Sequence, residues 1–409
     1  MQTIFKYISQ HGAWAFLFMA AISTSLLGPL NQFSFLYTAA LLVLPLNISA
    51  LRKITNINFL IIFLLAACSA SIILADPAAI FKPWQRLGYF ILLLLTVSPL
   101  VSSKQLDIFR IQAFEWCMNL CVFVGVASFF CYFLGINYMR TIINVSDSFS
   151  GSFGGITPQS MLLGPVAGIA ANWLLYKILK RYFSQTTFSP LILLMLGTCL
   201  CSMLLSSSRG AFLATVMTAL YVLFMFTKDH IRKAPKIIFV LLLCFTAASP
   251  LIGNFADGLQ NKQQANMEKG GTLSSRQSLW NERIKEFKSS PIYGVGFSSQ
   301  KEIRIDIRTL NTGAVEPGTS YGAVFAMTGL LGGIPFLMIL ASQILKKPSA
   351  AFGMHVISPA QVCLVFFGMH MMVEGYVFAA GSPLCALLWL SVGAASAWQN
   401  KNITNIACL

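Results

Sequence analysis

An arginine at the start of an apolar segment is the residue of this chain best placed to do chemistry. Arg209 follows three serines, Ser206, Ser207 and Ser208, and precedes a long apolar run. We expect it at a helix N-terminus, where a cation alone opposes the helix dipole. A bound anion would instead be held by the guanidinium, the dipole and the backbone amides together. The motif therefore predicts an anion site. The alternative is an arginine that only reaches the membrane–water interface.

Two more arginines share one predicted helix. Ser274 and Gln277 have the spacing of a capping box, so a helix is expected over about 274–288, ahead of Pro291. We expect it to lie on the membrane or to cap the membrane domain, although an ordinary surface helix with solvated arginines would have the same pattern. Helical spacing places four side chains on one face: Arg276, Trp280, Arg283 and Phe287.

Other polar residues lie beside or within apolar segments. Arg86 follows Lys82-Pro83-Trp84 and is either an anion ligand or an interface anchor. Glu316 stands where a long polar segment returns to an apolar one. Partial burial there would raise its pKa towards that of a general base, whereas a solvated loop acid would do no chemistry. His370 and Glu374 are one turn apart in an apolar segment, where ionisable groups indicate function or pair with each other or with an arginine.

The elements that must position these residues are membrane helices. Hydrophobic residues make up 56% of the 409 residues and charged ones 10%, and most apolar runs approach the roughly 20 residues that cross a bilayer. Runs of this length exclude a transmembrane barrel. We predict an all-α integral membrane protein with about 12 spans, at 12–28, 33–51, 57–75, 86–102, 114–136, 160–180, 189–206, 210–227, 235–252, 321–345, 358–376 and 380–397.

The distribution of charge predicts the topology. With the N-terminus in the cytoplasm, short inner connections hold 15 Lys and Arg residues and short outer ones hold 4. One membrane domain is expected, with spans one to nine in 1–252, a periplasmic loop with an amphipathic helix in 253–320, and spans ten to twelve in 321–409. We interpret the net charge of +15 as this topology signal with anionic-lipid contacts, not as nucleic-acid binding. Residues 12–28 are expected to be a retained span, not a signal peptide.

Neither a metal nor another cofactor is expected. No acidic cluster has metal-binding spacing, and no glycine pattern typical of nucleotide binding occurs. Nine of the ten cysteines fall in apolar runs and Cys408 lies in the tail, so we expect buried thiols and no disulfide framework.

Together these motifs resemble the O-antigen ligase and O-antigen polymerase superfamily of bacterial surface-polysaccharide enzymes. The resemblance covers roughly residues 150–340 and includes the number of spans and the large loop between spans nine and ten. The matching motifs are Ser207-Ser208-Arg209-Gly210-Ala211-Phe212, Ser275-Arg276 with Leu279-Trp280, Ser290-Pro291-Ile292-Tyr293-Gly294-Val295-Gly296-Phe297, and Ser320-Tyr321 followed by Thr328-Gly329-Leu330-Leu331-Gly332.

The resemblance implies a multi-pass glycosyltransferase of the inner membrane with its active site on the periplasmic face. Its donor would be a glycan on undecaprenyl diphosphate, held by Arg209 and Arg276 and less securely by Arg86. The acceptor would be a lipid-linked repeat unit in a polymerase or lipid A-core in a ligase, with a flippase and a chain-length regulator as partners. Possible acceptor or loop contacts are Gln159, Arg283, Tyr321, His370 and Glu374.

One departure from the family pattern favours the polymerase branch. Ligases typically carry a His-Asn pair just before the span that Tyr321 opens, and this chain has Gly318 and Thr319 there. Glu316 is the nearby base. A lipid-linked-glycan flippase is the alternative from another class, but it would be expected to carry charges through the bundle centre and to show two related halves. A regulatory or teichoic-type ligase that acts on a protein or peptidoglycan acceptor is a third possibility.

The predicted topology can be tested by cysteine labelling. Cysteines introduced at Asn261 and Lys301 should react with a membrane-impermeant maleimide from the periplasmic side, and one at Lys233 only from the cytoplasm. The reason is the 15-to-4 bias of basic residues. The unmodified chain, whose cysteines are expected to be buried, serves as the background. Labelling of the loop from the cytoplasm would contradict the assignment of the site to the periplasmic face.

Overall fold

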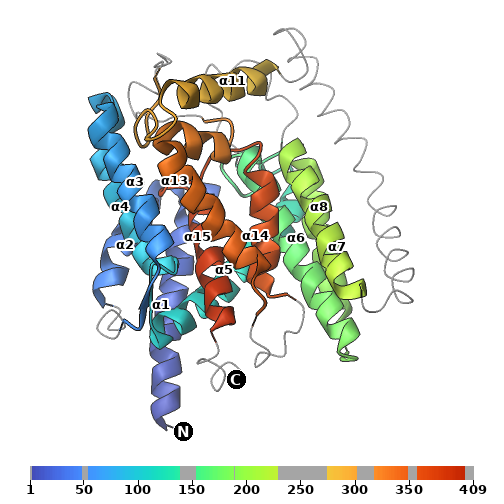
Figure 1. Ribbon diagram of the computed structural model, residues 1–409. Coiled ribbons are helices and arrows are strands. Elements are labelled where there is room, and N and C mark those ends of the chain that lie inside the picture. The colour runs from blue at the N-terminus through green and yellow to red at the C-terminus, as the bar shows by residue number, and fades with distance from the viewer. Residues whose placement is uncertain are drawn as a thin grey trace.

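A computed structural model describes residues 2–47, 54–138, 153–187, 189–228, 274–301, 317–348 and 357–400. These residues form a bundle of helices (Figure 1). The helices are α1 (Gln2–Leu26), α2 (Phe35–Asn47), α3 (Phe59–Ala75), α4 (Pro83–Val97), α5 (Lys104–Phe133), α6 (Ser160–Phe183), α7 (Pro190–Leu205), α8 (Arg209–Thr227), α11 (Ser274–Ser289), α13 (Ser320–Leu345), α14 (Pro359–His370) and α15 (Pro383–Gln399).

Short elements connect some of these helices. The 3-10 helix η1 (Gly28–Phe33) follows α1, and η3 (Ala79–Phe81) lies between α3 and α4. Strands β1 (Asn56–Ile57) and β2 (Val101–Ser102) form an antiparallel two-stranded sheet.

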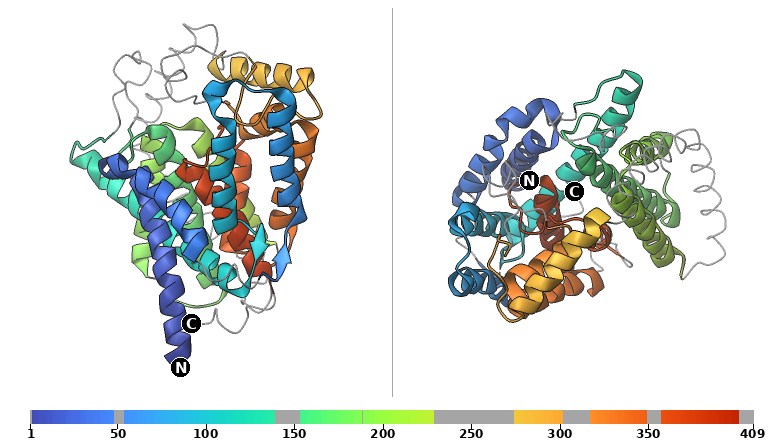
Figure 2. Two further views of the ribbon diagram at one scale, coloured as in Figure 1. Left: turned by 90° about the vertical axis from the view of Figure 1, so that its left-hand side faces the viewer. Right: turned by 90° about the horizontal axis from the view of Figure 1, so that it is seen from above.

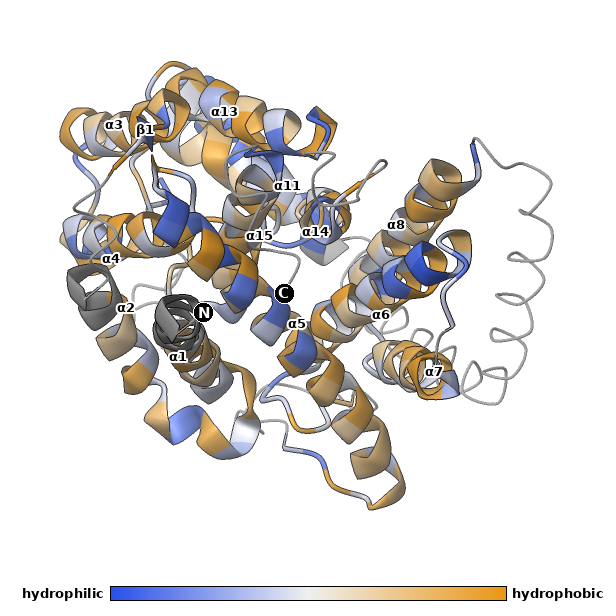
Figure 3. Ribbon diagram, turned by 90° about the horizontal axis from the view of Figure 1, so that it is seen from below, coloured by the Kyte–Doolittle hydropathy of each residue, from blue (hydrophilic) through white to orange (hydrophobic). Residues whose placement is uncertain are grey.

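The helices have the apolar character of a multi-pass membrane protein. In the described part of the chain, α5, α6, α8 and α13 are long and apolar enough to cross a membrane, and α3, α7, α14 and the Gly12–Leu26 part of α1 are shorter apolar helices. Figure 3 shows how much of the bundle is hydrophobic. Exposed side chains on α3, such as Phe59, Phe63 and Ile73, would be costly in water and suit contact with lipid.

The predicted spans agree with these helices in position but not always in length. Each predicted span overlaps a helix, except 235–252, which lies outside the described residues. Helix α5 begins about ten residues earlier than the predicted 114, because the Ser103 hydroxyl caps it by accepting from the Leu106 amide. Helix α14 ends at His370, although a span to 376 was predicted. The number of membrane crossings stays a prediction.

The two ends of the bundle differ in what covers them. Helix α11 lies across one end, and α1 begins and α15 finishes at the opposite end (Figures 1 and 2). The connection between α3 and α4 lies at the α11 end (Figure 2). We call these the α11 end and the terminal end. The predicted loop helix therefore caps the bundle, in agreement with one of the two expectations from sequence.

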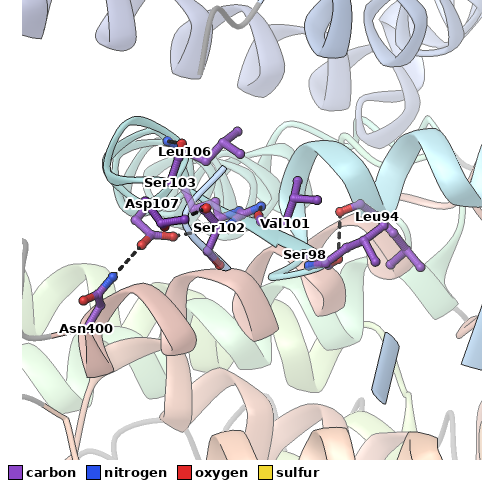
Figure 4. Close-up of polar contacts among 11 residues, drawn as sticks. Leu94, Ser98, Val101, Ser102, Ser103, Leu106, Asp107 and Asn400 are labelled. Carbon is purple, nitrogen blue, oxygen red and sulfur yellow. Dashed lines mark hydrogen bonds and ion pairs between the residues drawn. The ribbon is translucent and has the colours of Figure 1, made fainter. Parts of the chain in front are cut away.

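Near the terminal end, a fully buried arginine joins α5 to its surroundings. Arg110 has no exposed surface, and its guanidinium donates to Asp107 at 3.2 Å and to the Val101 carbonyl at 2.8 Å. The Asn400 amide donates to the second oxygen of Asp107 at 3.1 Å, which fastens the end of α15 to the start of α5 (Figure 4). A buried charge needs such partners, so this arginine has a structural role.

Helix α13 is broken at Gly329, where a loop is inserted. Gly329 has φ 61° and ψ −158°, a backbone conformation that is almost restricted to glycine. The break separates the amides of Leu330 and Leu331 from their usual acceptors one turn earlier. Those amides donate instead to Pro291 and Ile292, at 2.8 and 3.1 Å.

The same loop also satisfies the carbonyls left by the break. The amides of Val295 and Gly296 donate to Ala326 and Met327, at 2.9 and 3.2 Å. Four hydrogen bonds to the loop thus replace two within the helix, so the two amides and two carbonyls that the break separates keep partners, as a membrane helix requires. We call residues 291–296 the inserted loop. The helix bounds agree with the predicted span 321–345, and the break at Gly329 is a feature that was not predicted.

Because the inserted loop packs closely against the break of α13, substitution of the glycines at this contact should strongly destabilise the protein. A Cβ at Gly329 would overlap the Ile292 carbonyl, and one at Gly294 (φ 76°) would overlap the Met327 carbonyl. Gly329→Ala should therefore cost at least about 2 kcal/mol of stability, measured as a lower midpoint of thermal unfolding in detergent. The control is Gly197→Ala on α7, where a Cβ meets no atom within 4 Å. Equal stability of the two variants would contradict this account.

Candidate functional site

Helix α11 is fixed to the bundle by the face predicted from its sequence. Leu279 and Arg283 are buried, and the Phe287 ring packs edge-on against Phe325 of α13, with 5.9 Å between ring centroids. Trp280 donates its indole N–H to the Gly318 carbonyl at 3.4 Å. The alternative of a surface helix with solvated arginines is therefore wrong for Arg283. The first turn of α11, with Arg276, is held over the bundle.

Arg276 forms an ion pair with a residue 98 positions away. Its guanidinium donates to Glu374 Oε1 at 2.5 Å, and each side chain retains about a fifth of its exposure (22% and 23%). Glu374 is itself fixed, since its backbone carbonyl accepts from the Ser320 hydroxyl at 2.8 Å and its amide donates to the His370 carbonyl at 3.1 Å. The pair is thus set into the α11 end but still accessible to solvent.

Glu374 belongs to an irregular stretch that begins where α14 stops. Residues 371–382, which we call the irregular segment, form turns between α14 and α15. The first turn of α13 holds it: the Ser320 amide and the Thr319 hydroxyl both donate to the Met371 carbonyl, and the Tyr376 amide donates to the Ser320 hydroxyl. These bonds compete with continuation of α14, so the helix ends at His370.

Arg209 begins α8, as predicted, and lies next to this segment. Ser208 is the N-cap residue but makes no side-chain capping bond, and Arg209 is exposed. A Cβ on Gly210 would lie 2.5 Å from Val373 Cγ2 and 3.8 Å from His370 Cδ2, so only glycine allows α8 to approach this closely. The N-terminus of α8 therefore lies against the residue that precedes Glu374.

His370 is buried between aromatic rings beside the same helix start. Its ring stacks with Phe366 and Tyr376, and Nδ1 lies 3.2 Å from the Tyr376 hydroxyl. Within the described residues, Nε2 is buried and has no hydrogen-bond partner. An unsatisfied buried ring nitrogen is costly, so a bound ligand or water would be stabilising here.

Arg86 lines a cavity on the other side of the irregular segment. It donates to the Ser298 hydroxyl at 2.9 Å. The cavity has a volume of about 280 Å³ and lies between α2, α4, the first half of α13 and residues 375–381. The structure thus brings the start of α8, with Arg209, to Val373 and Arg276 to Glu374, and places Arg86 in a cavity that Gly375 also lines.

The other predicted contacts have separate surroundings. Arg283 pairs with Glu286 at 2.8 Å, and both are buried, so this arginine supports the fold of α11. The Tyr321 hydroxyl donates to the Gly368 carbonyl at 2.9 Å, and Gln159 is exposed ahead of α6. Glu316 lies outside the described residues. Its neighbour Pro317 lines the cavity.

Sequence reasoning left one contact of the site open and missed another. It offered an arginine as a possible partner of Glu374 but did not identify Arg276, because α11 and the irregular segment lie far apart in the chain. The Ser298 hydroxyl was not a candidate, and the one signal for it was its position directly after the Tyr293–Phe297 motif. In the described part of the chain, no group of three His, Cys, Asp or Glu residues is arranged to hold a metal ion.

Comparison with known proteins agrees with these observations. Residues 190–337 match the family model described as O-antigen ligase, and this range includes α7, α8, α11, the inserted loop and most of α13. No curated protein matches the chain. Arg209 and Arg276 lie within the matched range, as do both glycines of the loop insertion. The match confirms, over residues 190–337, the resemblance to the O-antigen ligase and polymerase superfamily.

Proposed function

We propose that this protein is a polymerase-type glycosyltransferase of the bacterial inner membrane. It would move a glycan from undecaprenyl diphosphate to a sugar hydroxyl of a lipid-linked repeat unit at the periplasmic face. The observation that carries the proposal is the approach of Arg276 and of the start of α8, which carries Arg209, to adjacent residues of the irregular segment. Val373 packs at the start of α8, and Glu374 pairs with Arg276.

The arginines suit recognition of a diphosphate. Departure of the lipid diphosphate leaves negative charge on its oxygens, and guanidinium groups bind such oxygens through paired donors. The first turn of α8 adds backbone amides without a side-chain cap. Glu374 holds Arg276 in place before the anion arrives. Charges fixed beforehand stabilise the leaving group without a metal ion.

The acceptor hydroxyl must lose its proton as it attacks the anomeric carbon. A carboxylate within hydrogen-bond reach can take that proton, and Glu316 is our candidate. Direct displacement by the hydroxyl would invert the anomeric centre. Glu374 is less suited to this role, because its ion pair with Arg276 favours the charged, weakly basic carboxylate.

A ligase that transfers the glycan to lipid A-core is the second candidate, because the matching family model is described as O-antigen ligase. Deletion of the gene followed by gel analysis of the surface glycan separates the two. A single repeat unit on the core would support the polymerase. Free lipid-linked polymer with bare core would show a ligase, and an unchanged glycan profile would contradict both.

The roles of the arginines and of Glu316 predict different kinetic defects. Arg209→Lys keeps the charge but loses the planar fork, so donor affinity and turnover should fall substantially, as they should in Arg276→Ala. Glu316→Gln should bind donor nearly normally but lose roughly 100-fold or more in turnover. Donor affinity and turnover are measured at matched expression, with Lys288→Ala, an exposed cation of α11, as the control. Normal activity in both arginine variants would refute the diphosphate site.

The anchoring of Arg276 by Glu374 can be measured by a double-mutant cycle. Arg276→Ala, Glu374→Ala and the double variant should give a coupling energy of about 1–3 kcal/mol in detergent unfolding. The control is the pair Lys177–Glu115, separated by 3.8 Å and more exposed, for which less than about 1 kcal/mol is expected. A coupling no larger than in the control would mean that Glu374 does not position Arg276.

A further inference from the structure

The cavity beside Arg86 is a built pocket that the diphosphate site does not use. Arg86 is the single charged residue among those that line it, and no carboxylate faces it in the described part of the chain. The other lining groups are aromatic rings, small side chains and backbone of the irregular segment. Its volume of about 280 Å³ is near the lower limit of roughly 300–1,000 Å³ for small-molecule sites. It therefore suits one sugar ring better than a lipid chain.

Its lining has the chemistry that a sugar needs. Three tyrosine rings, Tyr37, Tyr89 and Tyr376, offer flat apolar surfaces with polar edges. The guanidinium of Arg86 carries N–H donors that suit hydroxyl or carboxylate oxygens, and it donates to the Ser298 hydroxyl of the cavity wall. Two of the rings are fixed, because Tyr37 donates to the Ala380 carbonyl at 2.9 Å and Tyr376 contacts His370.

The wall that carries Ser298 is held rigidly. Phe297, directly after the inserted loop, is fully buried between Phe90 of α4 and Phe378, with ring centroids 6.1 and 5.0 Å away. Its amide donates to the Ser71 hydroxyl of α3 at 3.0 Å. Ser298 itself has φ 56°, a strained conformation for a residue with a side chain. Strain of this kind at a cavity wall is typical of binding sites.

The cavity and the diphosphate site lie on opposite sides of Glu374 in the chain. Val373 packs at the start of α8, and Gly375 lines the cavity. The Cα atoms of these two residues are no more than about 7 Å apart, since each peptide unit spans 3.8 Å. A glycan held by its diphosphate at Arg209 and Arg276 could therefore meet a second sugar in the cavity.

We propose that this cavity binds the terminal sugar of the acceptor glycan, a proposal that rests on the proposed function. The acceptor hydroxyl forms a bond to the anomeric carbon of the donor as the bond from that carbon to the diphosphate oxygen breaks. The electron pair of the broken bond leaves with the diphosphate, and the hydroxyl proton passes to the general base. Arg86, which the resemblance assigned to the diphosphate, is thereby an acceptor-binding residue.

Equilibrium binding of acceptor glycans tests this proposal without turnover. The probes are the repeat-unit glycan and the core oligosaccharide, released by mild acid and thus without lipid or diphosphate, added to the full-length protein in detergent. We expect the wild type to bind one of them, and Arg86→Ala and Tyr89→Ala to weaken that binding at least ten-fold. Arg209→Ala should bind it normally. Gln85→Ala is the control, because Gln85 is exposed on α4 beside Arg86 and does not line the cavity.

Each other outcome overturns the proposal. Binding of neither probe by the wild type, or equal binding by Arg86→Ala and the wild type, would remove the acceptor from this cavity. Weaker binding of the intact lipid-linked donor by Arg86→Ala, with released glycan bound normally, would return Arg86 to the diphosphate. Arg86→Gln, which keeps a donor towards Ser298, replaces Arg86→Ala if that variant does not fold. A failure of the proposed function gives a different result. Normal glycan transfer by the Arg209 and Arg276 variants would refute the proposed function, but it would not change the binding of released glycan to the cavity.

Discussion

The insertion of residues 291–296 into the break of α13 is the interaction on which the rest of the α11 end depends. Two hydrogen bonds that a continuous helix would make are replaced by four to the inserted loop. The exchange gives partners to the amides and carbonyls that the helix break separates within an apolar span. It also fixes both neighbours of the loop in sequence. Helix α11 precedes it and carries Arg276, while the buried Phe297 follows it and precedes Ser298, which lines the cavity.

The surroundings of four arginines separate structural roles from candidate anion-binding roles. Arg110 and Arg283 are almost fully buried, and each pairs with an acid three residues away. Because both partners of such a pair lie on the same helix, the charge of the arginine is neutralised locally, without a residue from another part of the chain. Arg276 instead depends on a partner 98 residues away and stays partly exposed, and Arg209 is exposed at a helix start. Only the last two can exchange solvent for an anion without leaving a buried charge unpaired.

Much of the fold could be predicted from the sequence, because apolar length and helical spacing are local properties. The positions of the helices, the face of α11 and the start of α8 at Arg209 all followed from them. The break at Gly329 could not be predicted this way. A glycine in an apolar run is normally interpreted as a tolerated residue within a helix. A break there is predicted only if the loop that replaces the lost helical hydrogen bonds is known. The early end of α14 could not be predicted for the same reason, because it depends on hydrogen bonds from Ser320 and Thr319 at the start of α13.

The need to pair backbone groups in a membrane also explains why the candidate site lies where regular helices end. A regular membrane helix uses all its backbone groups internally, so it can offer a ligand only side chains. At the α11 end, the start of α8 and the irregular segment have backbone groups outside regular helices, and Gly210 and Gly375 allow close approach. The Arg276–Glu374 ion pair and the start of α8, which has no side-chain cap, therefore coincide at Val373 and Glu374. That coincidence requires the first turn of α13 to hold the irregular segment through Ser320. The inserted loop then allows α13 to keep this turn in place although the helix is broken below it.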